Sequence, residues 1–201
     1  MEKILFLVFG AIVTLLVTNF SKWIEKQNHL KKQTEIFLEF VDNIILKYLN
    51  IYIAQYDKLL EDIDKDEFFD SRLMTTSPML NKGIFDFFEK SDLTKIFDHC
   101  KQNSLVDVYH NFYEIDFMQS NSPLLLLDKY RKTILDHFEE DKLHDETLEE
   151  HKVYCPFYKQ QRELFIQEIK MYKKHSENLI ESFTKVKTEL KSIDELNNDG
   201  I

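Results

Sequence analysis

The first candidate for catalysis is the pair Arg131 and His137, which lie six positions apart in the segment YRKTILDH. An imidazole transfers protons near neutral pH, and a guanidinium stabilises the charge on a phosphorane. Together they would suit cleavage of RNA without a metal ion. In the structural alternative, Arg131 pairs with Asp128 at i−3, while His137 caps the helix or packs. Residues six apart on an unbroken helix project about 120° apart, which favours the structural interpretation.

A second group of side chains has the chemistry of a metal site. His144, His151 and Cys155 are spaced seven and four residues apart, on one stripe of a possible helix. Imidazole and thiolate ligands suit zinc or another transition metal. The set lacks a tight paired motif, so we favour ordinary polar surface and predict no metal and no other cofactor. The acidic clusters at 61–70 and 139–150 lack the central glycine of a calcium loop, and we predict solvated faces there.

The glycine content limits the elements that could position these residues. The chain has three glycines in 201 residues, and Gly83 alone lies between the apolar N-terminus and the C-terminal tail. Phosphate-binding loops and tight hairpins need glycine where φ is positive or where the backbone approaches a ligand. Nucleotide-binding α/β folds are therefore close to excluded, and we predict an all-α fold.

Charge and cysteine content narrow the classes of partner. The net charge is −10, from 26 basic and 36 acidic residues. Broad nucleic-acid binding depends on neutralising phosphates with Lys and Arg, so we do not expect it. The two cysteines, Cys100 and Cys155, have no motif spacing. This is typical of thiols in a reducing compartment.

The most apolar segment, residues 4–20 (ILFLVFGAIVTLLVTNF), contains no charge. A helix apolar on every face has to be surrounded by protein or lipid, and this one covers about 25 Å, the short end of what crosses a bilayer. It lacks the cleavage site of a secretory signal peptide. We therefore predict a transmembrane anchor at 1–22, a cytoplasmic helical domain at 23–195 and a disordered tail at 196–201.

The basic residues around this segment predict its orientation. Lys22, Lys26, Lys31 and Lys32 follow it, whereas only Lys3 and the terminal amine precede it. By the positive-inside rule, the C-terminal body is cytoplasmic. The lipid bilayer is thus the first predicted partner.

Small and polar residues recur along one side of the predicted span. Gly10, Thr14 and Thr18 are four residues apart, and Asn19 follows. They are either ordinary residues of a membrane helix or a face for helix packing, because small residues let helices approach closely in lipid. In a ring of several copies, the Thr14 and Thr18 hydroxyls and the Asn19 amide would line an aqueous path.

A long helix is predicted to follow the anchor directly, because no glycine or proline occurs between Gly10 and Pro78. We expect it to end in the acidic stretch 61–67. Its apolar positions form one stripe at helical spacing. The members are Val41, Ile45, Tyr48, Tyr52, Tyr56, Leu59 and Ile63.

Shorter helices are predicted in the middle of the chain. One covers roughly 80–90, a second begins near Asp92 with Ser91 as its N-cap, and a third covers roughly 105–119. Ser122-Pro123 predicts a further helix start, with proline at the first helical position.

The last predicted helix carries a seam in which spacings of four and three alternate over about four heptads. This seam could pack against the 37–63 helix of the same chain or against a neighbouring subunit. Its members are Phe165, Ile169, Tyr172, Ser176, Leu179, Phe183, Val186, Leu190 and Ile193.

The motif and the architecture resemble known families. Arg131 to His137 is similar to the Arg-x4–6-His motif of the HEPN superfamily of metal-independent RNases, with Lys132 where a polar residue is common. With the single N-terminal span and the helical body, the whole chain resembles the accessory membrane protein of type VI-B CRISPR systems. The resemblance implies a HEPN-like bundle and a ring-shaped oligomer in the bacterial inner membrane. It also implies that the ring enhances antiphage defence alongside an RNA-guided RNase, and that the Arg-His motif is structural.

Three hypotheses for function follow. In the leading one, the protein is a membrane-anchored oligomeric effector of bacterial defence that forms a pore or depolarises the membrane, and it is not an enzyme. In the second, it is a membrane-tethered HEPN ribonuclease that uses Arg131 and His137. In the third, it is a single-pass scaffold that recruits a cytoplasmic partner.

Overall fold

The structure is a computed structural model that describes residues 2–65, 90–98, 100, 104–140 and 155–198. Within these ranges, the side chains at 2–13, 90–92, 104, 140 and 193–198 are outside the description. All regular elements of the described part are helical, which confirms the predicted all-α class. The helices are α1 (Glu2–Phe40), η1 (Val41–Ile45), α2 (Leu46–Asp64), α3 (Lys90–Ile96), α4 (Ser104–Ser120), α5 (Pro123–Glu140) and α7 (Pro156–Asn198).

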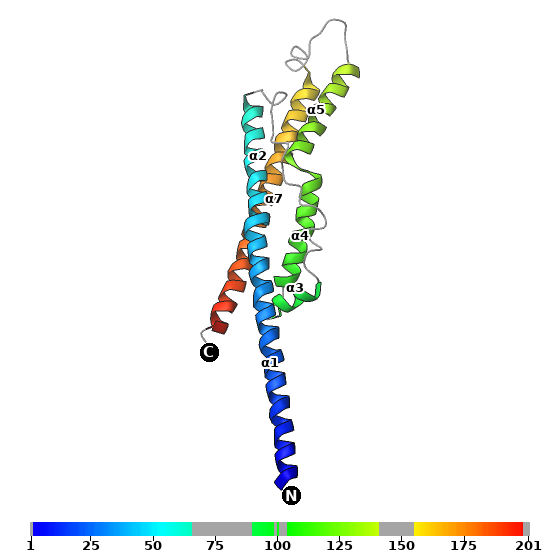
Figure 1. Cartoon of the computed structure of the whole chain (residues 1–201). Helices are drawn as coiled ribbons and strands as arrows, with labels where there is room; N and C mark the ends of the chain where they lie inside the picture. The colour runs from blue at the N-terminus through cyan, green and yellow to red at the C-terminus, as the bar shows by residue number, and fades with distance from the viewer. Residues whose placement is uncertain (1, 66–89, 99, 101–103, 141–154, 199–201) are drawn as a thin grey trace.

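One continuous helical rod contains α1, the π-helical segment η1 and α2 (Figure 1). From Glu2 to Asp64 it is about 95 Å long at 1.5 Å per residue. The rod ends in the acidic stretch, as predicted, where the Lys65 amide donates to the Glu61 carbonyl at 3.1 Å. The upper part of the rod belongs to the bundle, while the N-terminal part of α1 extends well beyond it.

The bundle is formed by α2, α4, α5 and α7, with α3 beside the middle of the rod (Figure 1). Helix α7 packs along α2 and also contacts α4 and α5. The stripe predicted for the first helix is confirmed, because all seven of its residues are buried. The predicted seam of α7 is also buried within the chain, apart from Ile193, which lies outside the described side chains.

Two helix starts follow from local sequence. Helix α5 begins at Pro123, and the Leu125 amide donates to the Ser122 hydroxyl at 3.4 Å, so Ser122 is the predicted N-cap. Helix α7 begins at Pro156. Proline suits both positions for two reasons. The amide of the first helical residue makes no hydrogen bond within the helix, and the proline ring fixes φ near −65°, which is the helical value.

Other predicted boundaries differ from the structure. Helix α3 begins at Lys90, so Ser91 lies inside the helix and is not its N-cap. Helix α7 continues to Asn198, three residues into the tail predicted to be disordered, because Glu195 and Leu196 are good helix formers and the first glycine comes at Gly200. The helix predicted over 80–90 lies outside the described residues, except for Lys90, and so do residues 199–201.

Candidate functional site

Arg131 and His137 both lie on α5 but contact different groups. Arg131 Nη1 is 4.0 Å from Asp128 Oδ1, the i−3 ion pair of the structural interpretation. The His137 ring packs on Phe157 of α7 with a centroid distance of 3.9 Å and an interplanar angle of 47°. Because α5 is unbroken between them, their side chains project about 120° apart. The helix therefore does not aim both groups at one phosphate.

His137 also contacts a cysteine of the predicted metal set. Its Nε2 lies 3.7 Å from Cys155 Sγ, at the start of α7. His144 and His151 lie outside the described residues. Among the residues that the structure describes, no group of three or more His, Cys, Asp or Glu side chains could hold a metal ion. The contact joins His137 on α5 to the residue just before α7, 18 positions away, so no spacing in the sequence indicated it.

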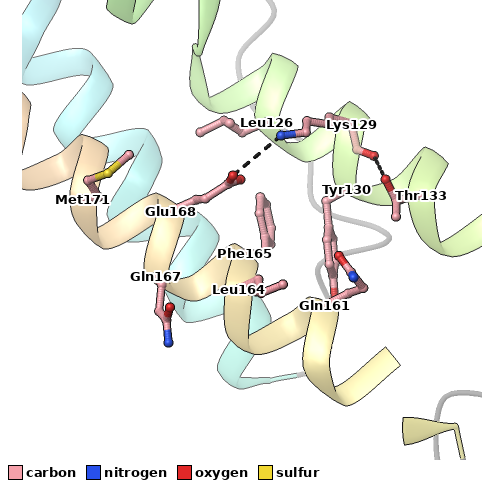
Figure 2. Close-up of a pocket in the computed structure, with 10 residues that line it drawn as sticks. All are labelled: Leu126, Lys129, Tyr130, Thr133, Gln161, Leu164, Phe165, Gln167, Glu168 and Met171. Atoms are coloured by element: carbon pink, nitrogen blue, oxygen red, sulfur yellow. Dashed lines mark hydrogen bonds and ion pairs between the residues drawn. The ribbon is translucent and has the colours of Figure 1, made fainter. Parts of the chain in front are cut away.

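A shallow groove of about 450 Å³ lies between α5 and α7 (Figure 2). Tyr130 of α5 and Phe165 of α7 stack at a centroid distance of 4.3 Å and form part of its wall. At the rim, Lys129 Nζ lies 3.6 Å from Glu168 Oε1, across the two helices. These carboxylate and ammonium groups neutralise each other. The groove thus has the apolar lining of a contact surface, without an arrangement of nucleophile and base.

A ladder of three buried tyrosines on α2 forms the polar centre of the core. The Tyr48 hydroxyl donates to the Tyr52 hydroxyl, and the Tyr56 hydroxyl donates to the Asn121 carbonyl at 3.2 Å. Burial raises the pKa of all three phenols above the ordinary value. The three phenols therefore stay protonated at neutral pH and form a hydrogen-bonded network in the core.

A further region of interest is the exposed part of α1. Every side chain from Thr14 to His29 is exposed. Leu15 and Leu16 are each 63% exposed, and Trp23 is 55% exposed. In a water-soluble domain such side chains would pack against the body, but here the helix extends away from the bundle (Figure 1).

The predicted packing face falls partly within this region. Thr14, Thr18 and Asn19 are exposed on the extended part of α1, whereas the side-chain environment of Gly10 lies outside the description. The Thr18 hydroxyl donates to the Thr14 carbonyl at 2.8 Å, and its oxygen can still accept a hydrogen bond. Among the described residues, no helix is both long enough and apolar enough to cross a membrane. Residues 4–13 of the predicted span lie outside the described side chains.

Comparison with models of protein families, with curated protein sequences and with solved structures finds no match to this chain. A proposal for its function must therefore come from its own residues and from the resemblance in architecture.

Proposed function

We propose that the protein is a single-pass, membrane-anchored helical effector with a cytoplasmic body, and that several copies assemble to open a pore in, or otherwise depolarise, the bacterial inner membrane. The observation that carries the proposal is the exposed N-terminal part of α1. Its described side chains from Thr14 to Phe20 are uncharged and exposed, and they continue a run that is free of charge from residue 4. A helix apolar on every face has to be surrounded by protein or lipid, and because the described bundle leaves this part of α1 exposed, we propose that lipid surrounds it.

The residues after residue 20 support a membrane boundary at this position. Phe20 and Trp23 stack with a centroid distance of 5.8 Å, and aromatic side chains concentrate at the headgroup level of bilayers. Lys22 and Lys26 are exposed on the following turns, where they would meet anionic headgroups. The first buried core residue, Phe37, lies about 20 Å along the rod from Trp23.

Assembly is part of the proposal because one helix cannot enclose a pore. Gly10, Thr14 and Thr18 share one side of α1 in sequence, and that side would face neighbouring helices or the lumen. The resemblance to the type VI-B accessory protein supplies the biological setting, antiphage defence in partnership with an RNA-guided RNase. In this proposal Arg131 and His137 act through helix packing and not in catalysis.

Membrane anchoring is tested by fractionating lysed cells. The wild-type chain is expected in the membrane pellet and should resist extraction at alkaline pH, while Leu15→Lys/Leu16→Lys should move it to the supernatant, because two charges in the span cost several kcal/mol. A matched control, Lys31→Gln/Lys32→Gln, should stay in the pellet. A wild-type chain in the supernatant would contradict the anchor.

The pore is tested separately by membrane depolarisation in cells and dye release from vesicles. Thr14→Leu/Thr18→Leu should abolish both signals if these hydroxyls line an aqueous path, because leucine makes the path apolar and narrower. Val17→Leu is the control on the same stretch of helix and should behave like the wild type. Unchanged signals in the double variant would eliminate the pore lining.

A further inference from the structure

Helix α4 has an apolar ridge on its outer side. Val106, Tyr113 and Phe117 are 63%, 76% and 52% exposed, and His110 is exposed between them. These four residues follow spacings of four, three and four, the pattern by which one helix packs on another. The opposite side of α4 is already buried in the core through Val108, Phe112, Ile115 and Met118. Phe117 contacts Tyr172 of α7 at a ring-centroid distance of 6.1 Å, so Val106 and Tyr113 are the most exposed apolar residues of this ridge.

The composition of this α4 ridge is that of an interface. Helix α4 contains no Lys or Arg, and interface cores are depleted of charge and enriched in tyrosine and phenylalanine. The charged residues of α4 are the acids Asp107, Glu114 and Asp116. Glu114 pairs with His175 of α7 at 2.8 Å. The ridge thus presents apolar side chains with carboxylates on its flanks, and its partner should be apolar and basic.

A surface with those properties occurs on the rod of the same chain. Along η1 and α2, the residues Ile44, Lys47, Ile51, Ala54 and Lys58 follow spacings of three, four, three and four. Ile44 is 40% exposed, the Lys58 side chain is 50% exposed, Lys47 and Ala54 are exposed, and Ile51 is half-buried. This α2 ridge therefore combines apolar side chains with two lysines, of which Lys47 is exposed and Lys58 pairs with Asp62 of the same helix at 3.2 Å.

The two ridges lie at the same level of the molecule. The rod is tied to α7 by Lys187–Asp42 at η1 and by Lys173–Asp57, at 2.5 Å, on α2. Helix α4 contacts the same part of α7, because Asn111 donates to Ser182 at 2.7 Å and Glu114 pairs with His175.

These ties also give the direction of each ridge. In both α2 and α4 the numbering rises as that of α7 falls, so the two ridges run parallel to each other.

We propose that the α4 ridge of one copy packs on the α2 ridge of the next copy, in a head-to-tail contact that repeats around an axis parallel to the rod. This inference rests on the proposed function, in which all copies stand in one membrane. Because the ridges are parallel and level, a rotation without axial shift brings them together. Such a contact generates a closed ring, whereas a contact with axial shift would generate a helical filament.

Cysteine cross-linking of the full-length protein in native membranes tests the contact. In a Cys100→Ser/Cys155→Ser background, a chain with both Ala54→Cys and Tyr113→Cys should form a ladder of covalent oligomers on mild oxidation. Each substitution alone should give none. Cells that express the two single variants together should give dimers only, because each chain then carries one half of the contact.

Two outcomes overturn the proposal. Cross-linking of the Tyr113→Cys chain alone would place α4 against α4, and absence of a ladder from the double variant would leave the two ridges apart. Fractionation separates this failure from that of the proposed function. A chain that pellets with membranes but does not cross-link keeps the anchor and loses the interface, whereas a chain in the supernatant that cross-links loses the anchor alone.

A charge substitution gives an independent readout. Tyr113→Lys places a cation opposite Lys47 and Lys58, so the detergent-solubilised particle should fall to the mass of a single chain. Tyr113 is exposed, so the helical circular dichroism should be unchanged. Gln160→Lys, an exposed site on α7 away from both ridges, should keep the assembled mass. An assembled particle with Tyr113→Lys would contradict the interface.

Discussion

At the scale of single residues, the buried polar groups show how this core tolerates so many hydroxyls. Tyr48 and Tyr52 bond to each other, and Tyr56 bonds to a backbone carbonyl at the start of the connection to α5. Ser176, which interrupts the apolar seam of α7, is fully buried, and its hydroxyl donates to the Tyr172 carbonyl at 3.0 Å. Each group has a partner, so burial carries little penalty.

Removing one hydroxyl of the tyrosine ladder tests how much the stability of the fold depends on these hydrogen bonds. Tyr52→Phe leaves the Tyr48 hydroxyl without its partner on α2, so we expect the free energy of unfolding to fall by about 1–3 kcal/mol. Thermal or denaturant unfolding in detergent, followed by circular dichroism, measures it. The control is Tyr113→Phe at an exposed position, which should change stability by less than about 0.5 kcal/mol. Equal effects at the two positions would contradict a structural role for the ladder.

The thiol of Cys100 provides a second prediction at the scale of single residues. Burial, with a smaller contribution from the negative charge of Glu189, raises the pKa of Cys100 from 9.0 to about 11. At pH 8 its thiolate should be roughly 100-fold scarcer than in the unfolded chain, so iodoacetamide should alkylate Cys100 that much more slowly in the native protein. The raised pKa of Cys100 also stabilises the folded state at pH values below 9. This stabilisation is lost as the pH rises toward 11. Equal rates for native and denatured chains at pH 8 would refute it.

Contacts between single residues were the part that sequence could not predict. The ion pair of Lys173 with Asp57 joins positions 116 apart, and the contact of Cys155 with His137 joins the residue before α7 to α5. Such pairs depend on the rotation and offset of one helix against another, which periodicity does not encode. The i−3 pair of Arg131 with Asp128 was predictable, because helix geometry alone sets its distance.

At the scale of elements, patterns of apolar residues predicted most of the described helices. The stripe on α2 and the seam on α7 became the two largest buried faces, because a helix in water must bury such a stripe. The π-helical turn Val41–Ile45 was not predicted. A π-helical turn contains about one more residue than an α-helical turn. Val41 and Ile45 are both buried, so the apolar stripe continues through this turn into α2.

Ser176 gives a prediction for the packing of α7. Its side chain lies against Met118 of α4, with Oγ 3.7 Å from the sulfur, at a position that has no exposed area. Ser176→Leu should overpack this contact and lower the free energy of unfolding by about 1–3 kcal/mol, although leucine would complete the heptad pattern. Ser176→Ala should be tolerated within about 1 kcal/mol, because the hydroxyl bonds only within its own helix and to the thioether. Increased stability of the leucine variant would contradict the packing.

At the scale of the whole molecule, the bundle and the exposed part of α1 are separate in their contacts. The buried core begins at Phe37, and the side chains from Thr14 to His29 are exposed. The charge-free run of residues 4–20 predicts a lipid environment, and contacts between copies are not encoded in the fold of a single chain. Among the described residues no helix is apolar enough to span a membrane, so the bilayer stays a prediction from the sequence.

Truncation tests this separation. A chain that begins at Trp23 keeps every described buried residue, so it should remain helical and melt cooperatively without detergent, and it should fractionate with the supernatant. Circular dichroism and centrifugation measure both properties. Aggregation or loss of helix in the truncated chain would show that residues 1–22 contribute to the body. A chain that begins at Asn43 is the contrasting variant and should not fold, because it lacks Phe37, Phe40 and Val41.

The unbroken backbone from Glu2 to Asp64 has a mechanical consequence. The portion of α1 before Leu30 is about 40 Å long, and its described side chains, from Thr14 to His29, are exposed, so this portion would act as a lever arm. A tilt of about 10° within the bundle would move the far tip by about 7 Å, more than one helical turn. Repacking of a few side chains around Lys187 and Asp42, where η1 contacts α7, would therefore be amplified into a larger displacement of the N-terminal tip.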